Sequence, residues 1–421
     1  MTDARPTNPS ELERLRRRTV ATLVAGVALG STGHIAAVTV ATIVATHIVG
    51  GTTAWSGAPS ATVVLGSAAG AIGLSWLMVR RGRRFGLAFG YVVSVFGALV
   101  AAASVILLSL PMLLVGTVLI GFGNSSNQLS RYTAADMAPT TRRASAIGVV
   151  VWGATIGAVA GPNLAAPAGK IALALGLPEL SGPYLVPVIF VGAAAILSFA
   201  LLRPDPYQLA DESSRHDRAG GDRSVAVSVA SILARPSVPV AMVALVAGQF
   251  VMVLIMTMTP LHMTDHGHDL AAVGLVLSGH TFGMFGLSPI SGRLTDRFGS
   301  VPVILAGLAV VALASVLAAI APPDGGAILF LALFLLGYGW NLGYVAGSAL
   351  LTHGLSLAER TRVQGLTDGL IWSSAAVASL GSGIVLAYAG YAILGLMGAG
   401  LVVVPILLVI ARRTAVAAST G

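Results

Sequence analysis

Residues 300–321, SVPVILAGLAVVALASVLAAIA, form an apolar run without a charged side chain. An α-helix rises about 1.5 Å per residue, so about 20 apolar residues cross the roughly 30 Å hydrocarbon core of a bilayer. Lipid admits only helices or closed barrels, and unbroken runs of this kind predict helices. Similar runs recur along the whole chain and predict an all-α membrane protein. Twelve transmembrane spans are expected, at 19–48, 57–79, 86–108, 111–137, 143–168, 184–203, 238–262, 270–294, 300–321, 327–354, 361–387 and 391–411.

The composition supports the same class of protein. The chain has 421 residues, of which 56% are hydrophobic and only 10% are charged, whereas about a quarter of a soluble domain is charged. Cysteine is absent, which excludes disulfides and thiolate chemistry. The polar start and the length of the first apolar run argue against a cleaved signal peptide. No P-loop, nucleophile–base pair or metallohydrolase pattern occurs, so neither an enzyme nor a resident cofactor is expected.

The charges indicate how the chain is oriented. The net charge is +8, but the basic residues lie in small loop clusters rather than in one patch, which argues against nucleic acid as a partner. When the twelve spans are threaded in order, every Lys and Arg except Lys170 and Arg131 falls on one side of the membrane. Positive loops mark the cytoplasmic side. We therefore expect a multi-pass protein of the cytoplasmic membrane, a monomer, with both termini inside.

One long polar segment, RPDPYQLADESSRHDRAGGDRSVAVS (203–228), separates the first six spans from the last six. Its composition is typical of a solvated linker. The halves also resemble each other, since GFGN at 121–124 corresponds to GYGWN at 337–341. The predicted organisation is a cytoplasmic segment at 1–18, a six-helix bundle at 19–203, a linker at 204–237, a second six-helix bundle at 238–411 and a cytoplasmic tail at 412–421.

Two motifs resemble those of the major facilitator superfamily. GRLTDRFGS (292–300) matches its loop motif G-x-x-x-D-R-x-G, whereas the corresponding SWLMVRRGRR (75–84) has Val79 in place of the acid. Gly148, Gly157, Gly161 and Pro162 fit its G-x8-G-x3-G-P pattern, known as the antiporter motif. The resemblance covers the whole chain. It implies two pseudo-symmetric six-helix bundles that move a small solute by alternating access.

The motif residues are candidates for gating. Asp296 can meet the positive end of a neighbouring helix dipole, and Arg297 can hold the loop, so that one conformation is latched. With Val79 in the first half, this latch should be asymmetric. Gly157 and Gly161 allow close helix approach, and Pro162 bends its helix. Simple packing without gating is the alternative for the glycines.

Methionine and histidine gather between 252 and 284. Met252 and Met256 share one helix face, as do His280 and Met284, and thioethers with imidazole suit Cu(I). The two motifs resemble those of the CcoA-type copper importers, a branch of the same superfamily. The predicted metal ligands are Met252, Met256, His280 and Met284 in the membrane, with His262, His266 and His268 collecting the ion outside. The alternative is that the methionines only pack and that His280 bonds to a neighbouring helix.

Two charges lie inside predicted spans, where charges are costly and usually paired. Arg131 and Asp368 sit at similar depth in spans four and eleven. The superfamily resemblance implies that these spans face each other, so the pair would close a cytoplasmic gate. Local pairing of Arg131 with Asp136 is the alternative.

The transport cavity is expected near the bilayer midplane between the halves. Its predicted substrate-binding residues are His34, Asn124, Asn127, Gln249, Met252, Met256, His280, Met284 and Asn341. Three functions follow: a secondary active importer of a soft metal, Cu(I); a proton-coupled exporter of drugs or small organic metabolites; and a sensor built on a transporter fold. The first is our leading hypothesis and the second its alternative.

Overall fold

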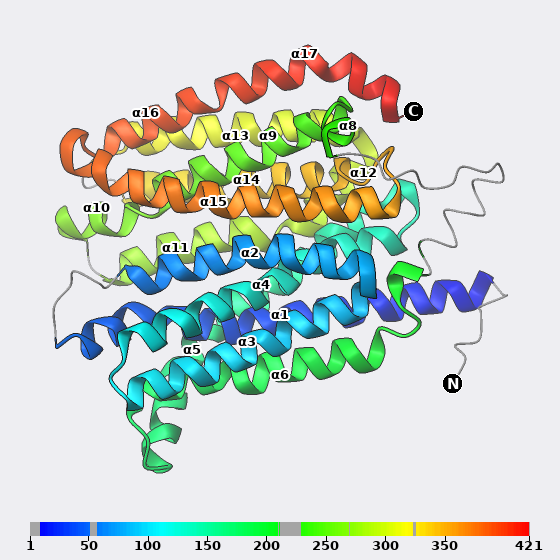
Figure 1. Ribbon diagram of the computed structural model, residues 1–421. Helices are drawn as coiled ribbons and strands as arrows, with labels where there is room; N and C mark the ends of the chain where they lie inside the picture. The colour runs from blue at the N-terminus through cyan, green and yellow to red at the C-terminus, as the bar shows by residue number, and fades with distance from the viewer. Residues whose placement is uncertain are drawn as a thin grey trace. The chain divides into compact units, whose positions relative to one another are not determined.

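The computed structural model describes residues 9–50, 57–208, 210, 229–268, 270–322 and 326–420, and no β-strand occurs among them (Figure 1). The helices of the first half are α1 (Pro9–Ile48), α2 (Ala58–Arg81), α3 (Arg83–Ile106), α4 (Leu110–Met137), η1 (Thr140–Arg142), α5 (Arg143–Ala174), η2 (Glu179–Ser181) and α6 (Gly182–Leu201). Those of the second half are α8 (Val229–Leu233), α9 (Ser237–Met256), α10 (Thr259–Asp265), α11 (Leu270–Phe285), α12 (Ser288–Phe298), α13 (Ser300–Ile320), α14 (Gly326–Leu350), α15 (Leu357–Ala389), α16 (Tyr391–Leu401) and α17 (Val403–Thr420).

The spans expected from hydropathy correspond to these helices. In the described part of the chain, eleven helical stretches are long and apolar enough to cross a membrane. Helix α4 is not one of them, although it has 28 residues, because its second half is rich in Asn, Ser and charged side chains. Those side chains are buried by neighbouring helices, so α4 still supplies the twelfth span.

Three predicted spans are each broken into two helices. The breaks separate α9 from α10, α11 from α12, and α16 from α17. Pro260, Pro289 and Pro405 lie within the first residues of the second helix in each pair. Proline has no N–H and clashes with the carbonyl four residues earlier, so it fits best in the first turn of a helix. The membrane spans expected at 238–262, 270–294 and 391–411 are therefore present, and each consists of two consecutive helices.

The contacts divide the chain into two compact units. Unit 1 contains Met1–Pro139, Gly153–Arg223 and Ser356–Trp372. Unit 2 contains Thr140–Trp152, Ser224–Leu355 and Ser373–Gly421. The start of α15 therefore belongs to unit 1, and the start of α5 belongs to unit 2. In the two halves expected from the linker, α5 lies wholly in the first half and α15 wholly in the second. The boundaries of those halves stay a prediction.

Small residues let the helices of unit 1 pack closely. Helix α4 packs mainly on α2 and α3, and α1 packs on α6. A Cβ added at Gly66 of α2 would overlap the carbonyl oxygen of Val118 on α4, and one added at Gly121 of α4 would overlap that of Val63 on α2. Backbones that approach this closely gain dispersion contacts that lipid cannot replace.

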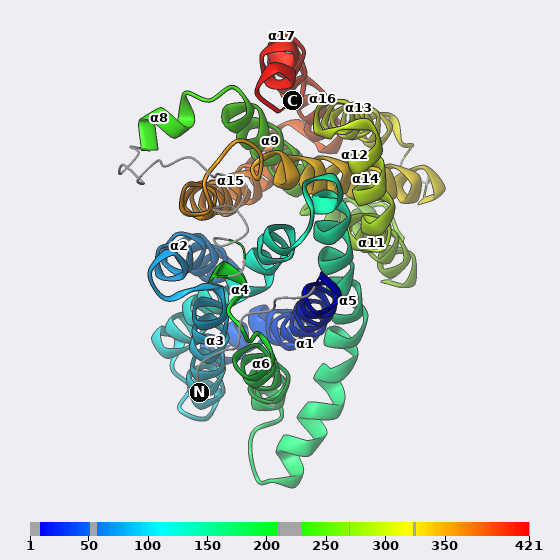
Figure 2. The same cartoon turned by 90° about the vertical axis from the view of Figure 1, so that its right-hand side faces the viewer.

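Unit 2 is organised around α14. Helices α9, α11 and α13 each pack on it, and α16 covers α13 (Figures 1 and 2). From Trp340 to Leu350, every residue of α14 is buried. A polar side chain on this helix must therefore find its partners on the surrounding helices.

Candidate functional site

Unit 1 contains the predicted ion pair. The Nη2 of Arg131 on α4 lies 2.6 Å from the Oδ1 of Asp368 on α15, and the two side chains are 1% and 2% exposed. Arg131 also donates to the hydroxyl of Tyr132 at 2.9 Å, and that hydroxyl donates to the same carboxylate oxygen at 3.3 Å. The expected pairing is confirmed, whereas its gating role stays a prediction.

Asp136, the alternative partner of Arg131, belongs to a second buried network. Its Oδ2 accepts from the Nη2 of Arg83 at 2.7 Å and from the Nε at 3.2 Å. Arg83 also donates to the Oε1 of Gln364 on α15 at 3.0 Å, and Arg360 forms an ion pair with Asp136 at 3.6 Å. The alternative pairing was therefore wrong. Sequence reasoning missed Arg83 because the basic loop residues were used only to orient the chain, although Arg83 lies within the loop-motif counterpart at 75–84.

Unit 2 contains the predicted contact of Asp296 with a helix terminus. Its two carboxylate oxygens accept the backbone N–H groups of Ala144 and Ser145, at 3.1 and 2.9 Å, in the first turn of α5. A carboxylate at this position satisfies free amides and complements the helix dipole. Arg297 is exposed, and its guanidinium lies 5.2 Å from the ring centre of Phe298. No ion pair of Arg297 occurs within the described residues, so its predicted role in holding the loop has no structural support.

The start of α15 is capped differently. Ser356 and Glu359 form a capping box, in which the Ser356 amide donates to the Glu359 carboxylate at 2.7 Å and the Glu359 amide donates to the Ser356 hydroxyl at 3.4 Å. The two helix starts therefore differ in how they are capped, while the asymmetric latch expected from Val79 stays a prediction.

The glycines of the antiporter motif bring α5 close to α1. A Cβ at Gly157 would overlap Ser31, and a Cβ at Gly161 would lie 2.9 Å from the Cβ of Ile35. Helix α5 continues through Pro162 without a break. These contacts account for the small residues by packing, and a gating role for Gly157, Gly161 and Pro162 stays a prediction.

The membrane histidine does not face the methionine helix. The Nδ1 of His280 on α11 lies 2.8 Å from the carbonyl oxygen of Leu333 on α14, and the side chain is 1% exposed. Met252 on α9 is also buried, but α9 and α11 each pack on α14 (Figure 2). The expected cluster between two adjacent helices was therefore wrong in its geometry. Met256 and Met284 are partly exposed.

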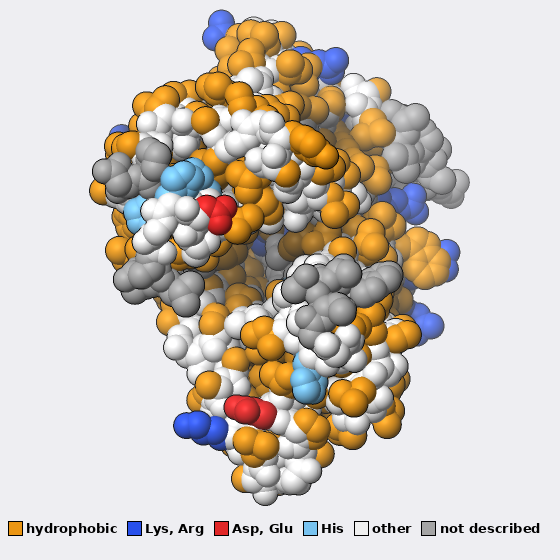
Figure 3. All heavy atoms as spheres, turned by 90° about the vertical axis from the view of Figure 1, so that its left-hand side faces the viewer, with side chains coloured by type: hydrophobic (Ala, Val, Ile, Leu, Met, Phe, Trp, Pro, Cys, Tyr) orange, Lys and Arg blue, Asp and Glu red, His pale blue; other side chains and the backbone are white. Residues whose placement is uncertain are grey.

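Histidine side chains gather at the end of unit 2 that carries α10 (Figure 3). The rings of His262 and His266 lie 4.4 Å apart, and His262 stacks on Tyr391 at 4.2 Å. No group of three or more His, Asp or Glu side chains that could hold a metal occurs within the described ranges. A collecting role for His262, His266 and His268 is untested.

Unit 1 also holds a cluster of neutral polar side chains. Asn127 donates to Asn124 at 3.0 Å and accepts from the Tyr91 hydroxyl at 3.0 Å. A Cβ at Gly30 of α1 would overlap the Oδ1 of Asn127. Asn124 and Asn127 are 6% and 7% exposed, so the amides are not completely enclosed. His34 lies one turn beyond Gly30, and within the described part of the chain its Nδ1 is buried without a hydrogen-bond partner.

Unit 2 has an amide beside stacked aromatic rings. The indole of Trp340 donates to the Oε1 of Gln249 at 2.8 Å. It stacks on Tyr344 with ring centroids 4.4 Å apart and planes 19° apart, and Phe285 meets it edge-on at 6.0 Å. Sequence reasoning selected Gln249 but missed the rings. The sequence does indicate this cluster, because GYGWN (337–341) contains a second aromatic residue, Trp340, that the corresponding GFGN (121–124) lacks.

Asn341, by contrast, is completely buried. Its amide donates to the Met284 carbonyl at 2.6 Å and to the Ser288 hydroxyl at 2.7 Å, and its oxygen accepts from Ser291 at 2.6 Å. These bonds tie α14 to the break between α11 and α12, where α11 leaves a carbonyl without a helical partner. The structure therefore assigns Asn341 to the scaffold rather than to the predicted substrate contacts.

Known proteins share both the sequence pattern and the fold. The profile of the Major Facilitator Superfamily matches residues 19–380 and 240–420. The Bacillus subtilis (strain 168) "Uncharacterized MFS-type transporter YdeG" is 36% identical over 391 residues, which cover 93% of this chain and 91% of that protein. The "Riboflavin transporter RfnT" of Brucella anthropi is 29% identical over 332 residues, covering 78% and 79%. The crystal structure of the transporter FucP in the outward conformation superposes with a TM-score of 0.74 at 16% identity, covering 93% of this chain and 98% of that one.

Proposed function

The chain belongs to the Major Facilitator Superfamily, and we propose that it is a secondary transporter of a small, uncharged, planar heteroaromatic metabolite. The observation that carries this proposal is the stack of Trp340 and Tyr344 beside the amide of Gln249. The protein would move its substrate across the cytoplasmic membrane by alternating access. Similarity to a transporter named for riboflavin, a planar heteroaromatic compound, supports the same class of substrate.

The aromatic cluster suits a flat ring system. Trp340 and Tyr344 keep 7% and 6% of their surface exposed, and a flat ring that reaches this part of the stack would gain about 1 kcal/mol beyond burial. The Oε1 of Gln249 is occupied by the Trp340 indole, while its NH₂ group makes no hydrogen bond to the residues that the structure describes. That group can donate to a ring carbonyl or ring nitrogen of the substrate.

The polar cluster of unit 1, taken by itself, is also uncharged. Asn124, Asn127 and Tyr91 are all neutral at physiological pH, as are Gln249 and the aromatic rings. A charged substrate would leave its charge without a partner at such groups, which is costly in a membrane protein. The clusters therefore favour an uncharged substrate with several polar edges.

Coupling to a proton gradient is the second part of the proposal. The Oδ2 of Asp368 is buried and has no hydrogen-bond partner within the described residues. A proton bound there would neutralise the carboxylate that holds Arg131, so the contact between α4 and α15 would weaken. Alternating access needs such a contact to break and re-form in each cycle.

The soft-metal hypothesis has less support. His280 uses one ring nitrogen to bond α14, which is the packing role that was the alternative from the start. A stacked indole and a set of amides offer nothing that Cu(I) prefers. Cu(I) therefore serves as a competing substrate in the uptake experiment.

Uptake into proteoliposomes tests the proposal. The panel should contain a flavin, a pteridine, a purine base, a sugar of similar size and Cu(I), each with and without a proton gradient. We expect uptake of a heteroaromatic compound, and about tenfold less uptake by the Trp340→Leu variant. Trp152→Leu is the matched control, because Trp152 is 40% exposed and should not contact the substrate.

Three outcomes would contradict the proposal. The first is uptake of the sugar but of no heteroaromatic compound. The second is equal uptake by the Trp340→Leu and Trp152→Leu variants. The third is accumulation of Cu(I) that disappears in the Met252→Leu variant, which would restore the soft-metal importer as the leading hypothesis.

A further inference from the structure

A cavity of about 620 Å³ lies within unit 2, apart from the clusters described above. Its walls come from the ends of membrane spans: two spans begin there, with Thr140 and Ser300, and three end there, with Phe298, Leu350 and Val416. Span ends mark the boundary between hydrocarbon and water. The cavity therefore opens at one surface of the membrane and not at its midplane.

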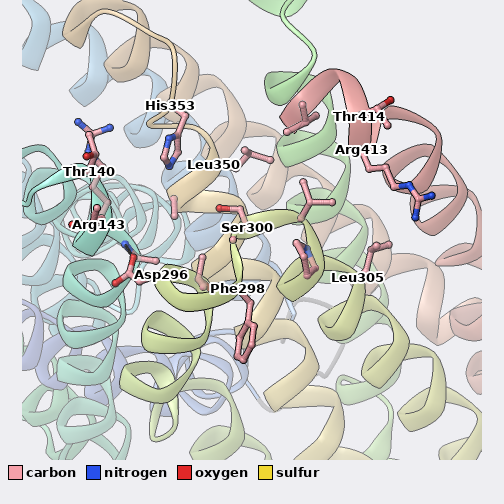
Figure 4. Close-up of a pocket in the computed structure, with 18 residues that line it drawn as sticks. Thr140, Arg143, Asp296, Phe298, Ser300, Leu305, Leu350, His353, Arg413 and Thr414 are labelled. Atoms are coloured by element: carbon pink, nitrogen blue, oxygen red, sulfur yellow. Dashed lines mark hydrogen bonds between the residues drawn. The ribbon is translucent and has the colours of Figure 1, made fainter. Parts of the chain in front are cut away.

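The lining combines an apolar floor with a basic rim. Leu305, Leu350 and Phe298 contribute apolar surface, whereas Arg143, His353 and Arg413 contribute basic groups. Figure 4 shows Arg143 and His353 on one side of the cavity and Arg413 with Thr414 on the opposite side. Basic groups on two sides of an apolar hollow favour an amphiphile with a negative charge.

The single carboxylate in the lining does not cancel this charge. Both oxygens of Asp296 accept backbone N–H groups at the start of α5 and compensate the positive end of that helix. Arg413 is exposed, and it makes no ion pair or hydrogen bond with the residues that the structure describes. Its guanidinium is therefore available to an anion from outside the chain.

We propose that this cavity binds the headgroup of an anionic phospholipid. A phosphate diester matches the planar donor fork of an arginine, and the first part of the acyl chains can cover the apolar floor. With the orientation expected from the sequence, this is the cytoplasmic surface, whose leaflet is rich in anionic lipid. The volume suits a headgroup and not a whole lipid. A bound headgroup would bridge α17 and the first turn of α5.

Lipid titration of the purified full chain tests this inference. Thermal stability in detergent should be measured against added phosphatidylglycerol, phosphatidylcholine and soluble glycerol 3-phosphate. We expect phosphatidylglycerol to raise the unfolding temperature with saturation, and the two other compounds to have little effect. In the Arg413→Gln variant the half-saturating phosphatidylglycerol concentration should rise about fivefold, because one arginine near a membrane surface is worth about 1 kcal/mol.

Arg412→Gln is the matched control. Arg412 is also exposed on α17 but does not line the cavity, so its variant should respond like the parent. An equal rise of the half-saturating phosphatidylglycerol concentration in both variants would show only a general attraction of positive charge to the lipid surface. That result would overturn the proposal. An equal response to phosphatidylcholine would overturn it as well. Binding of glycerol 3-phosphate as tight as that of phosphatidylglycerol would assign the cavity to a soluble anion instead. None of these outcomes bears on the heteroaromatic substrate.

Discussion

Neutralising Asp368 should loosen the packing of α15 in unit 1. The Asp368→Asn variant keeps the shape of the side chain but leaves the Arg131 guanidinium buried without its counter-ion, at 1% exposure. Removing one partner of a buried ion pair costs about 3–5 kcal/mol. Each 1.4 kcal/mol changes a population about tenfold, so the state in which α15 has left α4 should become roughly 10² to 4 × 10³ times more populated.

Cysteine labelling can measure this change, because the chain has no cysteine of its own. A reporter at Ser75→Cys on α2 is suitable, since Ser75 is 2% exposed. Gly365 of α15 stands directly against it, and a Cβ there would overlap the Ser75 hydroxyl. A membrane-permeant maleimide should therefore react only after α15 has moved away. We expect labelling about a hundredfold faster in the Asp368→Asn background.

The double variant separates the ion pair from general damage. Arg131→Gln combined with Asp368→Asn removes both charges, so labelling should be slower than in the Asp368→Asn variant alone. Asp265→Asn, which changes an exposed acid, should label like the parent. Labelling of the Asp368→Asn variant at the parent's rate, or no slowing in the double variant, would refute the view that this pair holds the contact.

Two further predictions concern stability. Asn341→Ala should lower the free energy of unfolding by on the order of 3 kcal/mol, because it removes the donor of the Met284 carbonyl and the acceptor of the Ser291 hydroxyl; thermal unfolding with no loss would contradict the scaffold role. Asp205, in the loop after α6, accepts backbone N–H groups at the start of α3, and its burial raises the pKa of its carboxyl above the ordinary value. An acid whose pKa is raised on folding contributes stability at low pH and loses it as pH rises through the folded-state pKa. The unfolding temperature of the parent minus that of Asp205→Asn should therefore fall as pH rises from about 4, and a difference that grows with pH would contradict the direction.

The helix count was predictable because the bilayer imposes a length. A run such as 300–321 must be a helix in lipid, and α13 covers it almost residue for residue. Hydropathy does not register where a helix breaks, since a single proline changes the mean hydropathy of an apolar run only slightly. The breaks before Pro260, Pro289 and Pro405 agree with the preference of proline for a first turn. Helices α5 and α6 nevertheless continue through Pro162, Pro167 and Pro187, so a proline alone does not fix where a helix ends.

Helix geometry predicts only part of how Arg131 is paired. Residues three or four apart share a helix face, whereas Arg131 and Asp136 are five apart and point in different directions. That spacing argues against the local pair. It does not identify Asp368 or Arg83 as partners, because they are distant in sequence and meet α4 only through packing.

A polar residue inside an apolar run indicates from the sequence alone that the side chain is buried and has a partner. Arg131, Asp368, His280 and Asn341 all agree with this rule. Which partner each one finds depends on which helices pack together, and contacts between distant helices leave no periodic signal in the sequence. The sequence by itself therefore determined the membrane spans, because the bilayer requires apolar runs of a fixed length. Only the tertiary structure decided that Asn341 supports the scaffold and that Trp340 stacks beside Gln249.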